Sequence, residues 1–247
     1  IHLLGLCKTH RKVNGQRRLH NDYHVVFKGR DDDAIYGVAI ILEPPLAKRI
    51  EHVVYISDRI IGLVLKVKHC KIGVIQVYAA QQGRPSHETA AFFDQLQSTV
   101  DKLPNYDKTV ILGDMNTHVG TSRVSIEHII GAFGIGDRNK KGERDFCIRN
   151  NYAVMNTFFM HRPSHKWAWY RWSKKAGMYT EKSMIDLVLT NDKRIINDVK
   201  TLPSVCLDSD HRLVLVKVHL QKPKELPSTK KKRLKIERLK HISVQRK

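Results

Sequence analysis

The stretch TVILGDMN, residues 109–116, decides the fold class because it joins a short apolar strand directly to a polar turn. Residues 109–112 are apolar or β-branched, which predicts a buried strand. Asp114 and Asn116 follow at once and place a carboxylate and an amide at the carboxyl end of that strand, where α/β proteins often carry their chemistry. An ordinary Asx turn is the alternative interpretation of these residues.

The remaining sequence alternates predicted strands with predicted helices. Apolar side chains three and four residues apart predict an amphipathic helix over residues 86–103, and a second helix is predicted over residues 142–150, with Phe146 and Ile148 facing a sheet. Paired strands followed by helices predict an α/β fold of two packed sheets flanked by helices. The further strands are predicted from apolar, β-branched runs over residues 34–42, 60–67, 72–80, 152–155, 185–189 and 213–220.

The charge of the chain favours a polyanionic partner. The 247 residues are 41% hydrophobic, enough for a buried core, and carry a formal net charge of +20. Residues 221–247 contribute +9 of that charge and contain two prolines, so we predict a domain over residues 1–220 followed by a basic linker or tail. DNA is the predicted partner, with RNA as the second choice.

The cysteine spacing is typical of a reducing compartment, and the lengths of the apolar runs bear on membrane insertion. Four cysteines form no C-x-x-C pair, so the sequence predicts neither a zinc site nor a disulfide framework. No apolar run is long enough to span a bilayer. We therefore expect a nuclear or cytoplasmic monomer with no membrane contact. The cysteines are Cys7, Cys70, Cys147 and Cys206.

Two more polar clusters adjoin predicted strands. Asp186 leads into an apolar strand, where a buried acid is costly unless it is paired; a frayed strand start in water is the alternative. In LDSDHR, residues 207–212, His211 can carry a proton near neutral pH and Asp210 can bind a cation; a surface turn is the alternative. One site for phosphate, water and Mg²⁺ explains all three clusters together.

Three motifs resemble, in order and spacing, those of the endonuclease/exonuclease/phosphatase superfamily. They are GDMN at residues 113–116, SMID at residues 183–186 and SDHR at residues 209–212. Further sequence segments extend the resemblance over residues 1–220, which are similar to the endonuclease domains of RTE-type LINE retrotransposons and to the related craniofacial development protein 2 family. Those segments are GQRRLHNDYHVVFKGR (15–30), YGVAIIL (36–42), GAFGIGDRN (131–139), GERDFCIRNNYAVMNT (142–157) and HKWAW (165–169).

The resemblance implies a four-layer α/β sandwich that hydrolyses a phosphodiester of DNA with Mg²⁺ as its cofactor. By the same resemblance, His211 would contact the scissile phosphate, Asp186 would orient that histidine, and Asp114 would hold or activate the attacking water. Asn116 would position the phosphate and Tyr78 would touch it. These roles suit the hydrogen-bonding chemistry of the side chains.

The metal side of the site departs from the family pattern. The resemblance places Asp210 at the metal, but the family begins with a strand that carries an Asn ligand, and this sequence starts after it. The next family ligand is the Glu of a Q-E-T or S-E-T triplet, where this sequence has Cys7, Lys8 and Thr9. Lys8 reverses the charge at that ligand position, which predicts weak Mg²⁺ binding. The alternative is an ammonium that stands in for the metal's charge.

The segment HKWAW and the residues after it are predicted to contact DNA. In the family this strand leads to a DNA-contacting loop, and aromatic rings among cations suit nucleic acid. Ordinary strand packing is an equally good interpretation for Trp169. The predicted nucleic-acid contacts are Lys166, Trp167, Trp169, Arg171, Lys174 and Lys175.

Three functions remain open on the sequence alone. The first is an active Mg²⁺-dependent endonuclease of retrotransposon origin. The second is a relic of the same fold that binds nucleic acid without cleaving it, because metal ligands are lost. The third and weakest is a phosphatase acting on small molecules or lipids, which the text around SMID and HKWAW disfavours.

Overall fold

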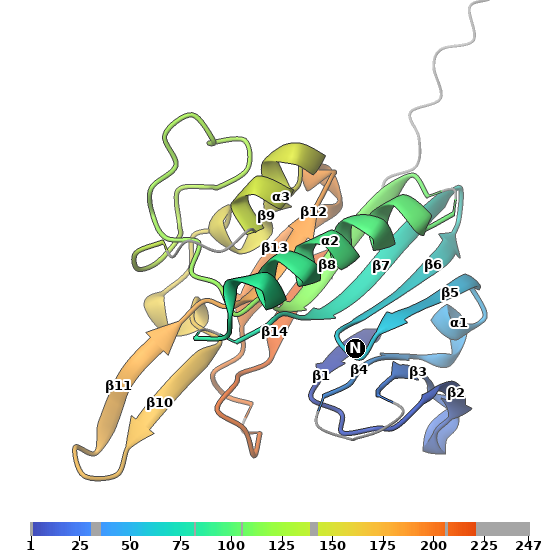
Figure 1. The fold of residues 1–247 in the computed structure, drawn as a ribbon, viewed down its shortest axis with the longest axis horizontal. Helices are drawn as coiled ribbons and strands as arrows, with labels where there is room; N and C mark the ends of the chain where they lie inside the picture. Colours follow the sequence, from blue (N-terminus) through green and yellow to red (C-terminus); the bar gives the residue numbers. More distant parts are fainter. Residues whose placement is uncertain are drawn as a thin grey trace, which may run out of the picture.

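The computed structural model describes residues 2–30, 36–81, 83–104, 106–138, 143–205 and 207–220. Its largest sheet has six strands in the order β5-β6-β7-β8-β12-β9 (Figure 1). Strands β7 and β8 run parallel, and every other neighbouring pair in this sheet is antiparallel. The bounds are β5 Ile50–Ser57, β6 Ile60–Val67, β7 Cys70–Tyr78, β8 Lys108–Asp114, β12 Asp186–Thr190 and β9 Ala153–Val154.

A second layer packs against one face of the six-stranded sheet. It consists of an antiparallel sheet in the order β1-β4-β3-β2 and of the antiparallel pair β13-β14. Ile40 of the first, Val199 of the second and Ile61 of the large sheet share one buried apolar cluster. The bounds are β1 Leu3–Cys7, β2 Asn14–Arg18, β3 His24–Lys28, β4 Val38–Leu42, β13 Ile196–Thr201 and β14 Val214–Val218.

Two helices cover the opposite face of the six-stranded sheet (Figure 1). Helix α2 (Ser86–Lys102) buries Phe93, Leu96 and Val100 there, as the spacing of its apolar residues predicts. Helix α3 (Glu143–Asn150) buries Phe146. Ile148 is 42% exposed, so its predicted place against a sheet is wrong. Residues two apart on a helix do not share a face.

Short elements and a protruding hairpin complete the chain. The antiparallel hairpin of β10 (Trp169–Ser173) and β11 (Met178–Ser183) extends away from the body (Figure 1). In the part of the chain that is described, no helix is long and apolar enough to cross a membrane. The remaining helical elements are α1 Pro44–Ala47, η1 His20–Asp22, η2 Met155–Thr157, η3 Pro163–His165 and η4 Lys193–Ile195.

The predicted fold class of packed sheets with helices is confirmed. Each predicted strand has a counterpart, although the match over residues 152–155 shrinks to two residues. Polar strands such as β2, NGQRR, were not predicted because they lack apolar alternation. A missing first strand stays a prediction, and the basic segment 221–247 lies outside the described residues.

Candidate active site

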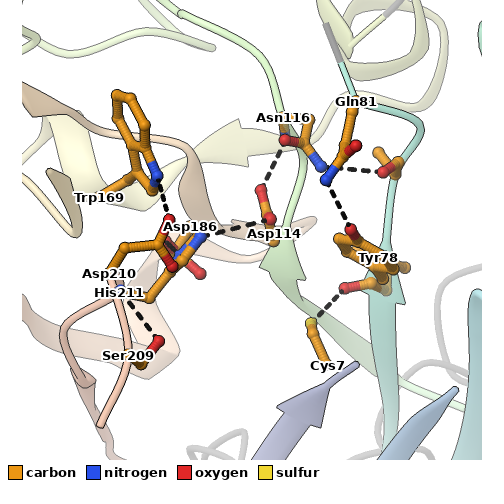
Figure 2. Close-up of polar contacts among 12 residues, drawn as sticks. Cys7, Tyr78, Gln81, Asp114, Asn116, Trp169, Asp186, Ser209, Asp210 and His211 are labelled. Atoms are coloured by element: carbon orange, nitrogen blue, oxygen red, sulfur yellow. Dashed lines mark hydrogen bonds and ion pairs between the residues drawn. The ribbon is translucent and has the colours of Figure 1, made fainter. Parts of the chain in front are cut away.

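Three strand ends bring their side chains to one place in the six-stranded sheet. In the sheet register Asp114, the last residue of β8, lies opposite Tyr78, the last residue of β7, and opposite Asp186, the first residue of β12. Parallel β7 and β8 end together and antiparallel β12 begins there, so all three residues meet at one edge (Figure 2). The two polar motifs predicted at strand ends are therefore neighbours in space.

The glycine of GDMN is needed by the backbone. Gly113 has a φ of +139°, and a Cβ atom there would lie 2.0 Å from the carbonyl oxygen of Val77. Any side chain would push β8 away from β7, which would separate Asp114 from Tyr78. Asn116 has a φ of +48°, a left-handed conformation that asparagine tolerates better than most residues.

His211 reaches the same place from the loop that precedes β14. The backbone N–H of Arg212 donates to the carbonyl of Ala168, and the N–H of Tyr170 donates to the carbonyl of Asp210, which fixes this loop against β10. The imidazole Nδ1–H donates to Asp186 at 2.9 Å. A carboxylate can only accept, so the Nδ1 atom carries the hydrogen.

The other ring nitrogen of His211 faces Asp114. Its Nε2 atom lies 3.8 Å from the Asp114 carboxylate, whose side chain is 4% exposed. Burial alone would lower the pKa of His211, but the hydrogen bond to Asp186 and the charges of Asp186 and Asp114 raise it above its ordinary value. The histidine is thus held between two carboxylates, which favours its protonated form.

Asp114 is the most perturbed acid of the cluster. Burial, followed by the charge of Asp186, raises the pKa of Asp114 to about 7, while His211, the Asn116 N–H and Lys8 act in the lowering direction. The backbone N–H of Asn116 donates to Asp114 at 2.9 Å. A carboxyl group with this pKa can both take up and release a proton near neutral pH.

Asn116 and Tyr78 line the side of the site next to β7. The Asn116 amide donates to the carbonyl of Ala79 at 2.9 Å. Tyr78 is 1% exposed, and its hydroxyl accepts a hydrogen bond from the amide of Gln81 at 3.2 Å (Figure 2). Burial raises the pKa of Tyr78 to about 12, so the phenol stays protonated and can donate.

Arg59 supports this side and was not predicted from the sequence. Its guanidinium lies 4.1 Å from the ring centroid of Tyr36 and 5.3 Å from that of Tyr78. It donates to the carbonyls of Tyr78 and Ala79 at 3.3 Å each. A single arginine in a hairpin turn carries no motif, so no sequence signal marks it.

The predicted metal side has a cation where a ligand is expected. Lys8 directly follows β1, its Nζ lies 5.5 Å from the ring centroid of Tyr78, and its charge acts on Asp114. Asp210 is exposed and accepts a hydrogen bond from the indole N–H of Trp169 at 2.8 Å. Within the described ranges, no group of three or more His, Cys, Asp or Glu side chains is arranged to hold a metal ion. Because Mg²⁺ requires several oxygen ligands, the residues present do not fit it.

The aromatic residues predicted to contact DNA differ from one another in exposure. Trp167 is 6% exposed beneath the guanidinium of Arg212, which lies 3.2 Å from its ring centroid. Its ring therefore packs the base of the hairpin, and its contact with DNA stays a prediction. Trp169 is half-buried and holds Asp210. Trp172, which the sequence analysis missed, is 49% exposed on β10.

The predicted basic contacts lie on or beside the same hairpin. Arg171 pairs with Glu181 at 2.6 Å, which neutralises part of its charge. Lys174 and Lys175 are exposed in the turn between β10 and β11. Lys166 lies 5.5 Å from the ring centroid of Phe133, on the body of the protein. The hairpin turn thus carries the most accessible of the predicted cations.

Comparison with known families decides the relationship. A family model described as Endonuclease-reverse transcriptase matches residues 72–215, which include Tyr78, Asp114, Asp186 and His211. The chain is also 31% identical over 234 residues to craniofacial development protein 2 of Bos taurus. The chain belongs to the endonuclease/exonuclease/phosphatase superfamily. The resemblance carried by GDMN, SMID and SDHR is thereby confirmed.

The relatives within this superfamily are longer than the chain. The match covers 93% of the chain but 38% of the Bos taurus protein. The Tragulus javanicus protein of the same name is also 31% identical, and that match covers 93% of the chain and 39% of the relative. Solved superfamily structures share the fold. The endonuclease domain of the retrotransposon TRAS1 matches at 14% identity with a TM-score of 0.58 over 81% of both chains. An AP endonuclease from Archaeoglobus fulgidus matches at 16% identity with a TM-score of 0.59 over 89% of both.

Proposed function

We propose that this chain is an endonuclease-type phosphodiester hydrolase of retrotransposon origin that acts on DNA and is impaired at its metal side. One observation carries the proposal: His211 donates to Asp186 at 2.9 Å while its other nitrogen lies 3.8 Å from Asp114. Three residues from motifs almost a hundred positions apart form one hydrogen-bonding and charge-paired group. Such a group can stabilise negative charge on a phosphate and move a proton.

The side chains suggest a division of roles. Hydrolysis forms a bond from a water oxygen to phosphorus and breaks the bond from phosphorus to a sugar oxygen. Asp114, with its pKa of about 7, would take a proton from that water, and the leaving sugar oxygen would take a proton from solvent. Protonated His211, oriented by Asp186, would donate to a phosphate oxygen. Asn116 and Tyr78 would fix the phosphate from the β7 side.

Mg²⁺ is the cofactor that membership of the superfamily implies, and it would supply positive charge at the phosphate. The surroundings of Lys8 and Asp210 do not fit that ion, so we assign no step to it. Loss of that charge is the physical reason for an impaired rate, since one ammonium group does not reproduce a divalent ion.

A nucleic-acid-binding relic is the second candidate, and Lys8 favours it. A cation beside Asp114 and Tyr78 can hold a phosphate without activating a water. Similar folds occur in proteins that handle DNA, including the 3′ phosphatase NExo from Neisseria, solved with a product DNA hairpin, at 16% identity and a TM-score of 0.55. These likenesses support nucleic acid as the ligand class.

Plasmid nicking tests the proposal. Purified protein is incubated with supercoiled plasmid in Mg²⁺ or in EDTA, beside His211→Ala. A matched control is His161→Ala, which removes the histidine of another pair, with Asp198 at 2.7 Å. We expect slow nicking that His211→Ala abolishes and that His161→Ala leaves in place. Because the residues present do not fit Mg²⁺, EDTA should change the nicking rate little. Salt-sensitive DNA binding with no nicking by the unaltered protein would instead establish the relic.

A further inference from the structure

A strip of cations leads away from the candidate active site along the four-stranded sheet. Two of its residues lie in the turn after β1, one lies on β2 and one lies in the loop after β7. All four are exposed. We name them the basic strip: Arg11, Lys12, Arg17 and Arg84.

Contacts connect the basic strip to the site. The ring of Tyr78 lies 6.1 Å from that of Tyr36, and the guanidinium of Arg84 donates to the Tyr36 hydroxyl at 3.4 Å. The backbone N–H of His10 donates to the carbonyl of Tyr36 at 2.9 Å, which places Arg11 beside the same tyrosine. Arg84 and the backbone next to Arg11 therefore adjoin Tyr36, whose ring neighbours Tyr78 at the site.

The backbone beneath the strip is fixed. Gly37, with a φ of +116°, packs closely enough that a Cβ atom would lie 2.5 Å from the Thr9 hydroxyl and 3.6 Å from the Arg11 nitrogen. Lys12 forms a bridge with Arg30, and the N–H of Val13 donates to the carbonyl of Arg30 at 3.0 Å. The charges thus sit on an ordered turn, which lowers the entropic cost of binding an extended ligand.

Within the described part of the chain, no acid pairs with the arginine and lysine side chains of the strip in the turn after β1 and on β2. Among the described residues, no carboxylate lies within 4.0 Å of the side-chain nitrogens of Arg11, Lys12 or Arg17, whereas the adjacent Arg18 pairs with Asp22 at 2.7 Å. Charged residues on an edge strand also discourage pairing with other chains, which would account for Arg17 on β2. It does not account for the cations in the two turns.

The opposite side of the site also carries cations. The β10–β11 hairpin, with Lys174 and Lys175 in its turn, lies on the other side of the molecule from β2 (Figure 1). Positive charge on both sides suits a polyanion that extends in both directions from the reacting phosphate. Duplex DNA is such a polyanion, and its stiffness keeps successive phosphates in line.

We propose that the basic strip binds the sugar-phosphate backbone of duplex DNA on the side of the scissile phosphate away from the β10–β11 hairpin. This inference rests on the proposed function, since it takes duplex DNA as the substrate. Each cation that contacts a phosphate adds close to one unit to the slope of log K against log salt.

The test measures that slope with a labelled 30-base-pair duplex of random sequence. The strip variant is Arg11→Gln, Lys12→Gln and Arg17→Gln together. The control, Lys66→Gln, Lys68→Gln and Lys102→Gln, removes the same charge from exposed positions near the end of β7 opposite Tyr78. Circular dichroism confirms that both variants fold. We expect the strip variant to lower the slope by about 2 to 3 and the control to lower it by less than about 1.

The outcomes separate this inference from the proposed function. An unchanged slope in the strip variant, or equal losses in both variants, would overturn it. A loss confined to an RNA duplex of the same length would also overturn it, because the strip would then serve RNA. A slope loss together with no nicking by the unaltered protein would support the strip while the hydrolase proposal fails. Nicking by the unaltered protein with an unchanged slope in the strip variant would support the hydrolase proposal and overturn the role of the basic strip.

Discussion

The two sides of the candidate active site differ in how completely they are built. On one side, His211 donates to Asp186 at 2.9 Å and lies 3.8 Å from Asp114; burial raises the pKa of Asp114, and the neighbouring carboxylates raise the pKa of His211. On the other side, Lys8 follows β1 and Asp210 is occupied by the indole of Trp169. The difference teaches that the hydrogen-bonded His211 group can be complete while the position expected to hold a metal ligand carries a cation instead of a carboxylate.

The largest effect is expected from removing the charged partner of His211. Asp186→Asn keeps the size of the side chain but removes the ionised acceptor that orients His211. We expect the plasmid-nicking rate to fall by about 100-fold or more, as loss of a positioned acid–base group generally does. Asp198→Asn changes the partner of His161 in the same way and serves as the control. Equal effects of the two substitutions would contradict a special role for the Asp186 pair.

The second-largest effect is expected from restoring a carboxylate at the position of Lys8. Lys8→Glu replaces an ammonium with a carboxylate near Asp114, and at ~4 Å and an effective dielectric of ~20 a unit charge pair is worth about 4 kcal/mol. Because Lys8 is partly exposed, we expect solvent screening to leave roughly 2 kcal/mol, or about 30-fold tighter Mg²⁺ binding. Isothermal titration calorimetry measures it, with the exposed Lys48→Glu as control. No gain would mean that the lesion lies elsewhere, such as in an absent first strand.

The pH dependence of stability tests the buried acid Glu143, which accepts a hydrogen bond from Thr117, the residue after Asn116. This carboxyl is 2% exposed and accepts a hydrogen bond from Thr117, and burial raises its pKa from 4.5 to about 7. The folded state therefore binds more protons than the unfolded state between these values, and its stability falls as pH rises from about 4.5 to 7. The loss is on the order of 3 kcal/mol.

Glu143→Gln should remove that fall. We expect the free energy of unfolding in urea to change less between pH 5 and pH 8 in this variant than in the unaltered protein. Glu127→Gln, at an exposed position, is the control and should keep the original pH dependence. If Glu143→Gln retains the full fall, the buried charge responsible lies at another acid, with Asp114 the first to examine.

The smallest expected effect concerns the link between the two sides. Trp169→Phe removes the indole N–H that donates to Asp210 at 2.8 Å, next to His211. A hydrogen bond to a charged, exposed partner contributes about 1 kcal/mol, so we expect the free energy of unfolding to fall by that amount. Trp172→Phe, which changes an exposed ring, should cost less. A larger loss for Trp172 would show that the hairpin is held by its outer aromatic residues instead.

The sequence predicted the positions of the strands that build the site because those strands are buried. Residues 60–65 are apolar, and the predicted strand 60–67 corresponds to β6 without a shift, whereas β2 and β11 are largely polar and were not predicted. Asp114 and Asp186 could be paired in advance because each stands at the end of an apolar run, and strand ends of one sheet meet at its edge.

Other features depend on contacts that no local pattern encodes. Trp167 and Trp169 are two residues apart in the sequence, yet Arg212 covers the first and Asp210 accepts a hydrogen bond from the second. Glu143 looks like an ordinary charge in the first turn of a helix, and only the packing of Thr117 shows that it is buried. These assignments follow from tertiary structure, which brings together residues from distant segments.

The composition of β1 has a consequence for handling the protein in solution. Leu3–Cys7 reads LLGLC, carries no charge and, among the described strands, is hydrogen-bonded to a neighbour on one side only, at β4. The backbone N–H and C=O groups of an uncharged edge strand can form hydrogen bonds with an extended segment of another molecule. Concentrated samples should therefore associate through backbone pairing at β1, and a lysine substituted on this strand should reduce that association.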